Sequence, residues 1–276
     1  PLLCYPPPMG KAEWGTDPEF FGPRHAHRER RIVRELDRHV TGERLHLECA
    51  AGVGSLTLTL ARIGPTVVSA DRSLRSLAHV MARWRFGASA GTVLPVVADI
   101  TRLPFADGKF DSASSAETLE HIDDHRTAVQ ELGRVLSPGG WLVGTVPADP
   151  DQWSDWDDWG GHLRRYDPAS MTEILTAVGP RPRVTVWGWP LLRLYDDLFL
   201  KRVNRRRLRS SLPVDQDPAL RRVSNLGRKR WLVRAVRGLF ELDRPFDGVR
   251  WGVGLLFAVQ KPSSETDAGS ESPPQS

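Results

Sequence analysis

The feature that most constrains the fold is a glycine-containing turn between two apolar runs. Residues 47–54 read LECAAGVG. Their first three residues are the end of the strand-like run 44–49, and the apolar stretch LTLTLAR follows them. Gly52 and Gly54 would let a ligand approach the backbone closely, because glycine has no Cβ and tolerates left-handed backbone angles. The sequence therefore predicts a strand–turn–helix unit with a ligand at the turn.

Strand-like and helix-like patterns alternate on both sides of this turn. Because strands and helices alternate, we predict an α/β fold with a doubly wound, mostly parallel, Rossmann-like sheet. The predicted strands are 44–49, 66–70, 94–99, 110–116, 141–146, 183–188 and 253–259, and the helices of the core cover 25–40, the segment capped by Ser73, 122–136 and 169–178. Residues 137–140, SPGG, are predicted to be the turn that closes the third of these helices.

Composition excludes several classes of protein. The chain has 276 residues, 40% of them hydrophobic and 26% charged, which is enough for a sizeable core. No apolar run approaches the roughly 18 residues that a membrane span requires. The start, PLLCYPPPMGK, does not have the pattern of a secretory signal. The two cysteines, Cys4 and Cys49, predict neither a disulfide framework nor a metal site, and they favour a cytoplasmic protein.

Charge is distributed unevenly along the chain. Residues 1–180 carry 19 basic and 24 acidic side chains, whereas residues 181–261 carry 19 basic and 7 acidic ones. The second segment therefore has a net charge of +12 and needs its own explanation. Residues 262–276 are polar and acidic, and they are predicted to be disordered.

Two carboxylates follow predicted strands. Asp71 closes the second strand, where a carboxylate can accept hydrogen bonds from both hydroxyls of a ribose, and Asp99 closes the third. A dinucleotide-binding fingerprint is the main alternative, but its last small residue would be the β-branched Thr57. The acid before the turn, Glu48, would also repel a pyrophosphate, whereas it suits a cationic amino-acid moiety.

Five segments, in order, resemble the class I S-adenosylmethionine (SAM)-dependent methyltransferases. The resemblance covers about residues 25–188 and is strongest to the branch with quinone-biosynthesis and natural-product enzymes. Ala50 stands where that family has its first glycine. The matching segments are 48–54 (ECAAGVG), Asp71, 97–111 (with VADI, LPF and FD), 117–122 (ETLEHI) and 136–140 (LSPGG).

The resemblance implies a seven-stranded sheet with an antiparallel last strand, and it implies SAM as cofactor, leaving as S-adenosylhomocysteine (SAH). Gly52 and Gly54 would pack against the methionine and ribose, and Asp71 would hold the ribose hydroxyls. Asp99 would accept from the adenine amine, and Ile100 would line the ring. The implied cofactor-binding set is Glu48, Ala50, Gly52, Gly54, Asp71, Arg72, Asp99, Ile100 and Glu117, the last near the methionine part.

The segment 147–167 leaves the fifth strand and is predicted to form the acceptor side of the site. Aromatic faces among carboxylates suit a cationic or polyhydroxylated acceptor, although a loop that simply packs on the fold is equally compatible. The predicted acceptor-binding residues are Trp153, Trp156, Trp159 and Arg165. The candidate general bases, in order, are His162, His121 and Tyr166; a loop-anchoring role for His162 and a scaffold role for His121 remain open.

The predicted domain organisation places a helical insert between the sixth and seventh strands. Since the sixth strand is expected to be parallel to the others, the insert should cover the site. Its basic helices could bind an anionic membrane, an acidic substrate or RNA, or they could be a solvated face. The predicted divisions are an irregular arm (1–24), the core (25–188), the basic insert (189–250), the last core strand (251–261) and the tail (262–276).

These observations predict an enzyme that transfers a methyl group from SAM by in-line displacement to an O, N or C nucleophile of a small molecule, such as a quinone, lipid or secondary metabolite. We expect a monomer or homodimer, with peripheral contact to an anionic membrane as one possible role of the insert. The alternatives are an RNA methyltransferase, a SAM-binding domain without catalysis and, less favoured, a NAD-dependent dehydrogenase.

Overall fold

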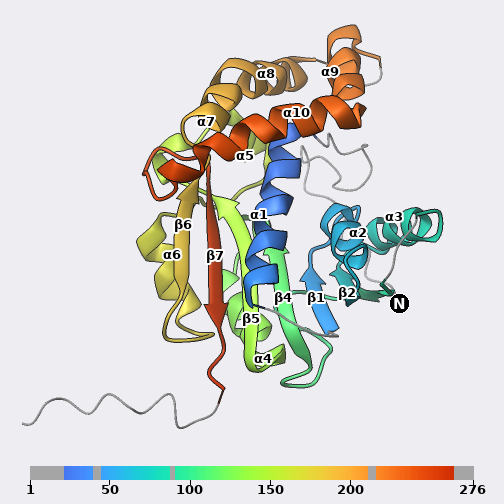
Figure 1. Ribbon diagram of the computed structural model, residues 1–276, viewed down its shortest axis with the longest axis vertical. Helices are drawn as coiled ribbons and strands as arrows, with labels where there is room; N and C mark the ends of the chain where they lie inside the picture. Colours follow the sequence, from blue (N-terminus) through green and yellow to red (C-terminus); the bar gives the residue numbers. More distant parts are fainter. Residues whose placement is uncertain (1–21, 40–44, 88–90, 211–215, 264–276) are drawn as a thin grey trace, which may run out of the picture.

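The computed structural model describes residues 22–39, 45–87, 91–210 and 216–263 (Figure 1). Cys4, nearly all of the predicted arm and the tail beyond residue 263 lie outside the described residues. Within them no helix is long and apolar enough to cross a membrane.

A single seven-stranded sheet forms the centre of the protein. Its strand order is β3-β2-β1-β4-β5-β7-β6, and β7 runs antiparallel to both β5 and β6 while the remaining pairs are parallel. The strands are β1 (Leu45–Cys49), β2 (Thr66–Asp71), β3 (Val93–Val97), β4 (Phe110–Ala116), β5 (Leu136–Pro147), β6 (Arg183–Trp187) and β7 (Gly254–Gln260). The predicted fold class, including the antiparallel last strand, is confirmed.

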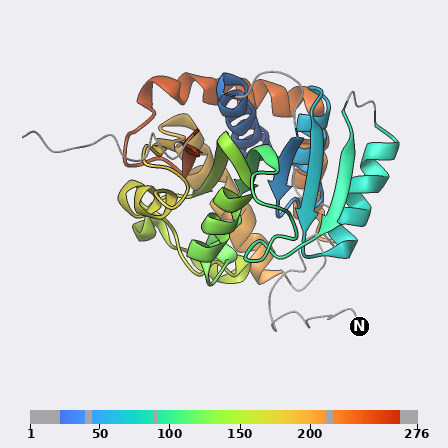
Figure 2. The same cartoon turned by 90° about the horizontal axis from the view of Figure 1, so that it is seen from below.

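Helices cover both faces of this sheet, as the view from below shows (Figure 2). Apolar side chains of α1 (Pro23–His39), α2 (Ser55–Ala61) and α3 (Leu74–Arg85) form one core with one face of the sheet. Side chains of α4 (His125–Val135) and α6 (Pro168–Leu175) form a second core with the other face. The side chain of Ser73 caps α3 by accepting from the Ser76 amide, as predicted.

The connection between β6 and β7 is helical and lies at the end of the sheet toward which β5 and β6 point (Figure 1). Its elements are α7 (Leu191–Tyr195), a π-helical turn η3 (Asp196–Leu200), α8 (Lys201–Arg209), α9 (Pro218–Arg228), α10 (Arg230–Phe240) and the short η4 (Glu241–Phe246). Asp217 caps α9 through the Ala219 and Leu220 amides, and Pro218 follows as its first residue. This is the predicted helical insert.

Two strand boundaries differ from the prediction. The segment 137–140 belongs to β5, where a bulge lies between the pairs Phe110–Leu136 and Ser112–Trp141. The third strand ends at Val97, so that Asp99 lies beyond it. Pro95 is tolerated inside β3 because this strand is at the edge of the sheet and needs no second hydrogen-bonded neighbour.

The buried His46 generates a prediction about pH and stability. Its ring nitrogens lie 2.8 and 2.9 Å from the hydroxyls of Ser112 and Ser114, and burial lowers its pKa to about 3. In the unfolded chain a histidine has a pKa of about 6.5, so the unfolded state alone takes up this proton between the two values. Stability should therefore fall as the pH decreases from about 6.5, by up to about 1.4 kcal/mol per pH unit for this group.

Urea unfolding of the wild type, His46→Gln and His79→Gln at about pH 7, 6 and 5 measures this dependence. The His46→Gln protein should show a shallower fall in unfolding free energy. His79 is exposed on α3, so its replacement should leave the slope unchanged. Equal slopes for the wild type and His46→Gln would show that His46 is not the responsible group.

Candidate active site

The glycine turn connects β1 to α2 through left-handed backbone. Ala50, Gly52 and Gly54 have φ angles of 59°, 52° and 77°, and the Gly54 amide donates to the Ala51 carbonyl at 2.9 Å. A Cβ on Gly54 would lie 2.7 Å from Cγ2 of Val80 on α3. Gly54 is therefore required both by its backbone conformation and by the close packing of α2 on α3.

Asp71 ties the end of β2 to this turn. Its side chain is 9% exposed, and its two oxygens accept from the Gly52 amide at 2.9 Å and the Ser73 amide at 2.8 Å. Burial raises its pKa, although these hydrogen bonds oppose the shift. Each carboxylate oxygen accepts one backbone hydrogen bond and retains capacity for another donor, as a ribose site would require.

Asp99 and Ile100 follow β3 at the same edge of the sheet. Asp99 Oδ1 accepts from the Thr101 amide at 2.9 Å and from its hydroxyl at 2.8 Å, and the amide hydrogen bond is the main reason why its pKa is lowered. Asp99 is exposed whereas Ile100 is buried. Arg72 is exposed, and its charge lowers the pKa values of both Asp71 and Asp99.

Glu48 forms a hydrogen bond within the fold. The side chain is 4% exposed, and its carboxylate accepts from the Thr57 hydroxyl, which also lies 3.1 Å from the Ser69 hydroxyl. These contacts join β1, α2 and β2 below the turn. These hydrogen bonds give Glu48 a structural role, and they explain why a hydroxyl-bearing residue stands at position 57. Contact of Glu48 with a cationic ligand stays a prediction.

Glu117 follows β4 and faces α1. Its backbone is left-handed, with φ 52°, and Arg28 Nη1 lies 3.6 Å from its Oε2. Burial raises the pKa of Glu117, but the charges of Arg28 and Arg24 outweigh that effect and leave it below its usual value. Its Oε1 atom is buried without a hydrogen-bond partner among the described residues. The carboxylate therefore has an unused acceptor at the edge where the glycine turn lies.

Sequence reasoning missed the contribution of α1. Arg28 Nη2 lies 2.9 Å from His25 Nδ1, and His25 Nε2 lies 3.0 Å from the Ser55 hydroxyl that begins α2. Side chains of α1 thus connect the glycine turn to Glu117. No local motif marks His25 or Arg28, since their partners are distant in the sequence.

The segment after β5 is organised by a buried carboxylate. Asp157 is fully buried, and its oxygens lie 2.7 Å from His162 Nδ1 and 2.8 and 2.9 Å from Arg165 Nε and Nη2. Burial alone would raise the pKa of Asp157, but the hydrogen bonds from His162 and Arg165 hold it well below its usual range. Asp157 therefore fixes the orientation of both side chains.

The three candidate bases have different environments. The rings of His162 and His121 meet edge to face, with centroids 4.7 Å apart, and both are partly exposed. Tyr166 is 2% exposed; its hydroxyl donates to the Leu119 carbonyl at 3.1 Å and lies 2.7 Å from His125 Nδ1. Burial raises the pKa of Tyr166. This environment favours a structural role for Tyr166, whereas the two histidines remain candidates for proton transfer.

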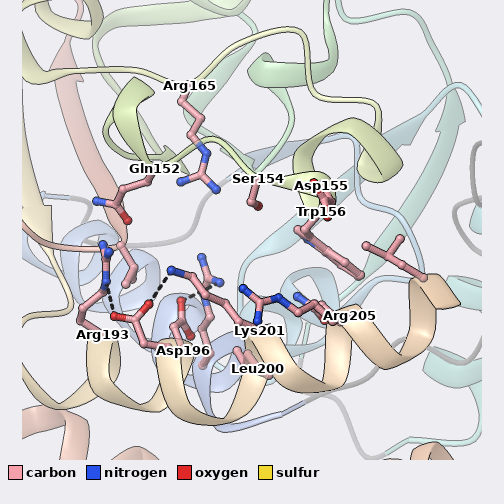
Figure 3. Close-up of a pocket in the computed structure, with 15 residues that line it drawn as sticks. Gln152, Ser154, Asp155, Trp156, Arg165, Arg193, Asp196, Leu200, Lys201 and Arg205 are labelled. Atoms are coloured by element: carbon pink, nitrogen blue, oxygen red, sulfur yellow. Dashed lines mark hydrogen bonds and ion pairs between the residues drawn. The ribbon is translucent and has the colours of Figure 1, made fainter.

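A cavity lies between the segment that follows β5 and the helices α7 and α8, and only two of the four predicted acceptor-binding residues line it. Trp156 and Arg165 line this cavity, together with residues such as Gln152, Asp196 and Arg205 (Figure 3). Trp159 does not line it; its ring contacts Trp156 and lies under Arg207 of α8, 4.8 Å from the guanidinium. Trp153 is 41% exposed and donates to Asp158 at 3.0 Å.

Comparison with known proteins agrees with this arrangement. Residues 47–144 match the family described as "Methyltransferase domain". This part of the chain, which holds the glycine turn, Asp71, Asp99 and Glu117, is therefore similar to a methyltransferase domain. A demethylmenaquinone methyltransferase of Mycolicibacterium vanbaalenii is 39% identical over 114 residues, which cover 41% of this chain and 46% of that protein. One from Streptomyces avermitilis is 40% identical over 151 residues, covering 52% and 61%.

The chain thus spans about half the length of the first of these relatives. Among solved structures, a phosphoethanolamine N-methyltransferase of Haemonchus contortus has a TM-score of 0.57 at 17% identity, covering 84% of this chain and 52% of that one. The cyclase SpnF has a TM-score of 0.54 at 21% identity, covering 86% and 82%. These similarities establish the fold of the domain, which can carry more than one chemistry.

The packing of α2 on α3 depends on the absence of a side chain at Gly54. Gly54→Ala should lower the free energy of unfolding by about 1–3 kcal/mol, because left-handed backbone and overpacking against Val80 both oppose a Cβ. Gly238→Ala is the matched control, since a Cβ there meets open space in α10 and should be neutral or slightly stabilising. Urea denaturation measures both, and equal stabilities would contradict the packing argument.

Proposed function

We propose that this chain transfers a methyl group from SAM to a small-molecule acceptor. The observation that carries the proposal is Asp71, whose carboxylate is held by the Gly52 and Ser73 amides beside a left-handed glycine turn. The turn and the carboxylate lie at the carboxyl edge of parallel strands, where α/β sheets bind ligands.

The residues present fit the cofactor. Asp71 would accept from the ribose hydroxyls, and Asp99 and Ile100 would receive the adenine. Glu117 Oε1, which has no hydrogen-bond partner in the part of the chain that the structure describes, is an acceptor suited to the cationic methionine amine. The sulfonium supplies an activated methyl group when SAM is bound. The protein's contribution is then to position the acceptor nucleophile in line and to exclude water.

Proton removal is assigned to His162. Its Nδ1 hydrogen bonds to Asp157, which leaves Nε2 to face an acceptor. His121, in contact with the His162 ring, is the second candidate. A base is needed only where the acceptor nucleophile must lose a proton.

We propose a quinone-like or related aromatic acceptor. The similar proteins of Mycolicibacterium and Streptomyces are demethylmenaquinone methyltransferases, which supports this choice. The acceptor would occupy the cavity lined by Trp156, Arg165 and Leu200. On this proposal residues 25–188 and 251–261 form the catalytic core, and the insert 189–250 forms a cap whose α7 and α8 close one side of the cavity.

Calorimetric titration with SAH tests the cofactor proposal. The wild type should bind SAH, and Asp71→Asn should bind it at least about tenfold more weakly, which is about 1.4 kcal/mol, because a charge-assisted acceptor is lost. Asp37→Asn is the matched control, since Asp37 is exposed on α1. A folded wild type that does not bind SAH, or unchanged affinity in Asp71→Asn, would refute the assignment.

We further propose that the cap docks on an anionic lipid surface, which would bring a lipid-soluble acceptor to the site. Trp231, Leu239 and Leu242 are 68%, 57% and 63% exposed and lie on one side of α10 and η4. The exposed Arg230 and Arg234 border these apolar side chains. Helices that lie in the membrane–water interface typically combine exposed tryptophan and leucine with arginine in this way.

Sedimentation with phosphatidylcholine vesicles, with and without phosphatidylglycerol, tests this docking. The wild type should sediment with the anionic vesicles, and a Trp231→Ser/Leu239→Ser variant should remain in the supernatant. Ile63→Ser is the control, since Ile63 is 55% exposed but lies after α2 outside the cap. Binding that is independent of phosphatidylglycerol, or equal binding by the wild type and the Trp231→Ser/Leu239→Ser variant, would contradict the proposal.

A further inference from the structure

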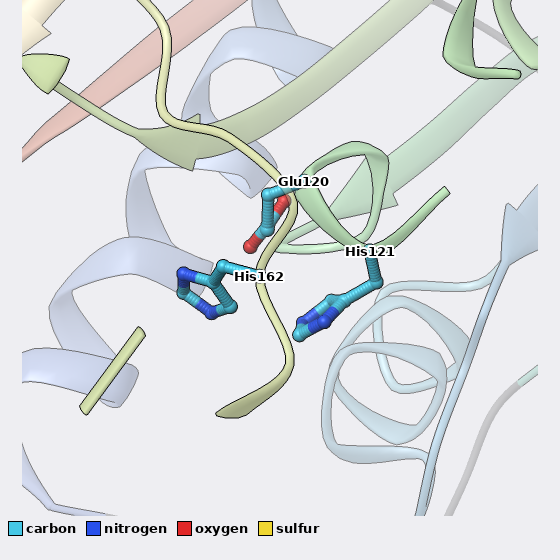
Figure 4. A group of neighbouring side chains, drawn as sticks. All are labelled: Glu120, His121 and His162. Carbon is cyan, nitrogen blue, oxygen red and sulfur yellow. The ribbon is translucent and has the colours of Figure 1, made fainter. Parts of the chain in front are cut away.

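Three side chains that the sequence does not group as a motif converge beside the proposed site. Glu120 and His121 belong to the short helix η1 (Leu119–His121), and His162 follows α5 (Asp155–Gly160). The two segments are joined by a hydrogen bond from the Leu163 amide to the Glu120 carbonyl at 2.7 Å. One carboxylate oxygen and one nitrogen of each ring all lie within 4.8 Å of one another (Figure 4).

Glu120 is the unexplained member of this cluster. Its side chain is completely buried, and neither carboxylate oxygen has a hydrogen-bond partner among the described residues. A buried carboxylate without partners is costly unless a proton or a cation neutralises it. Burial, together with the charge of Glu117, accordingly raises the pKa of Glu120 well above its usual value. The group is therefore either protonated or held for a positive ion.

Both histidines have the orientation of metal ligands. His121 Nδ1 donates to the Gly161 carbonyl at 3.3 Å, and His162 Nδ1 donates to Asp157 at 2.7 Å. In metalloproteins a ligating imidazole usually donates its other ring nitrogen to a carbonyl or carboxylate in this way, which fixes the tautomer and directs the lone pair at the metal. Nε2 is thus the ligand atom that each ring would use.

The arginine side chains near Glu120 are paired with other carboxylates. The Arg165 guanidinium is held by Asp157, and Arg28 lies 3.6 Å from Glu117. The nearby cations are therefore already matched by other carboxylates. Glu120 remains as the anionic ligand for an additional positive ion.

We propose that Glu120, His121 and His162 bind one divalent transition-metal ion of the Zn²⁺ type. Two imidazoles and a carboxylate form a familiar three-ligand set, which leaves a coordination position for water or for an acceptor oxygen. A metal there would lower the pKa of a bound hydroxyl. With the metal bound, His162 Nε2 is a ligand, so the role as a base proposed above applies to the metal-free protein. The binding itself does not depend on methyl transfer.

Titration of chelator-treated, tag-free protein with Co²⁺ in the absence of SAM, followed by visible absorption, tests this site. One equivalent should bind and give d–d bands, and Zn²⁺ should displace it. Glu120→Gln, His121→Gln and His162→Gln should each weaken metal binding by at least about tenfold. Loss of a residue that only hydrogen bonds to a metal ligand already weakens binding by about that factor, and loss of a ligand should cost more. His79→Gln, on the exposed surface of α3, is the matched control and should bind like the wild type.

Two results would overturn the proposal. One is the absence of saturable Co²⁺ or Zn²⁺ binding by the folded wild type; the other is binding that persists in all three ligand variants. Glu120→Gln is a neutral isostere of the protonated acid, so its fold should be retained, and circular dichroism checks this. Zn²⁺ should raise the melting temperature of the wild type but not that of Glu120→Gln. Because SAM is absent, failure here is independent of whether SAH binds.

Discussion

The hydrogen bond between the Gly52 amide and the Asp71 carboxylate is the contact on which the site depends. It joins the ends of β1 and β2 at 2.9 Å, and the Ser73 amide holds the other oxygen. The turn must be left-handed at three positions to reach Asp71, and Gly54 must lack a Cβ so that α2 can pack on Val80. Backbone, packing and ligand geometry are therefore set together.

The positions of Arg28 and of the cap depend on how α1 and the insert are attached to the sheet. His27 of α1 is completely buried against Trp187 and Phe240, the ends of β6 and α10. Burial lowers the pKa of His27 to about 4, so the ring is neutral near pH 7 and packs as an apolar group. This contact aligns α1, which carries Arg28 toward Glu117, and it fixes the cap above the carboxyl edge of the sheet.

Local chemistry decided what could be predicted from the sequence. The glycine turn, Asp71 and the antiparallel last strand were predictable because short motifs determine them or family resemblance implies them. The direction of side chains could not be predicted. Glu48, for example, faces Thr57 within the fold, and this contact depends on the position of α2. The contribution of Arg28 and the meeting of Glu120 with His162 were equally hidden, since each joins segments that only the complete fold brings together. Cysteine counting suggested no metal site, but it does not test a site of histidines and a carboxylate.

The central claim is that the edge formed by the glycine turn, Asp71 and Asp99 is a SAM site. A crystal structure of the protein grown with SAH tests it most directly. We expect the ribose hydroxyls within hydrogen-bond distance of Asp71, the adenine beside Ile100 and Asp99, and the amino-acid part toward Glu117. SAH bound elsewhere, or absent from a site that instead takes a dinucleotide pyrophosphate at Gly52 and Gly54, would contradict it.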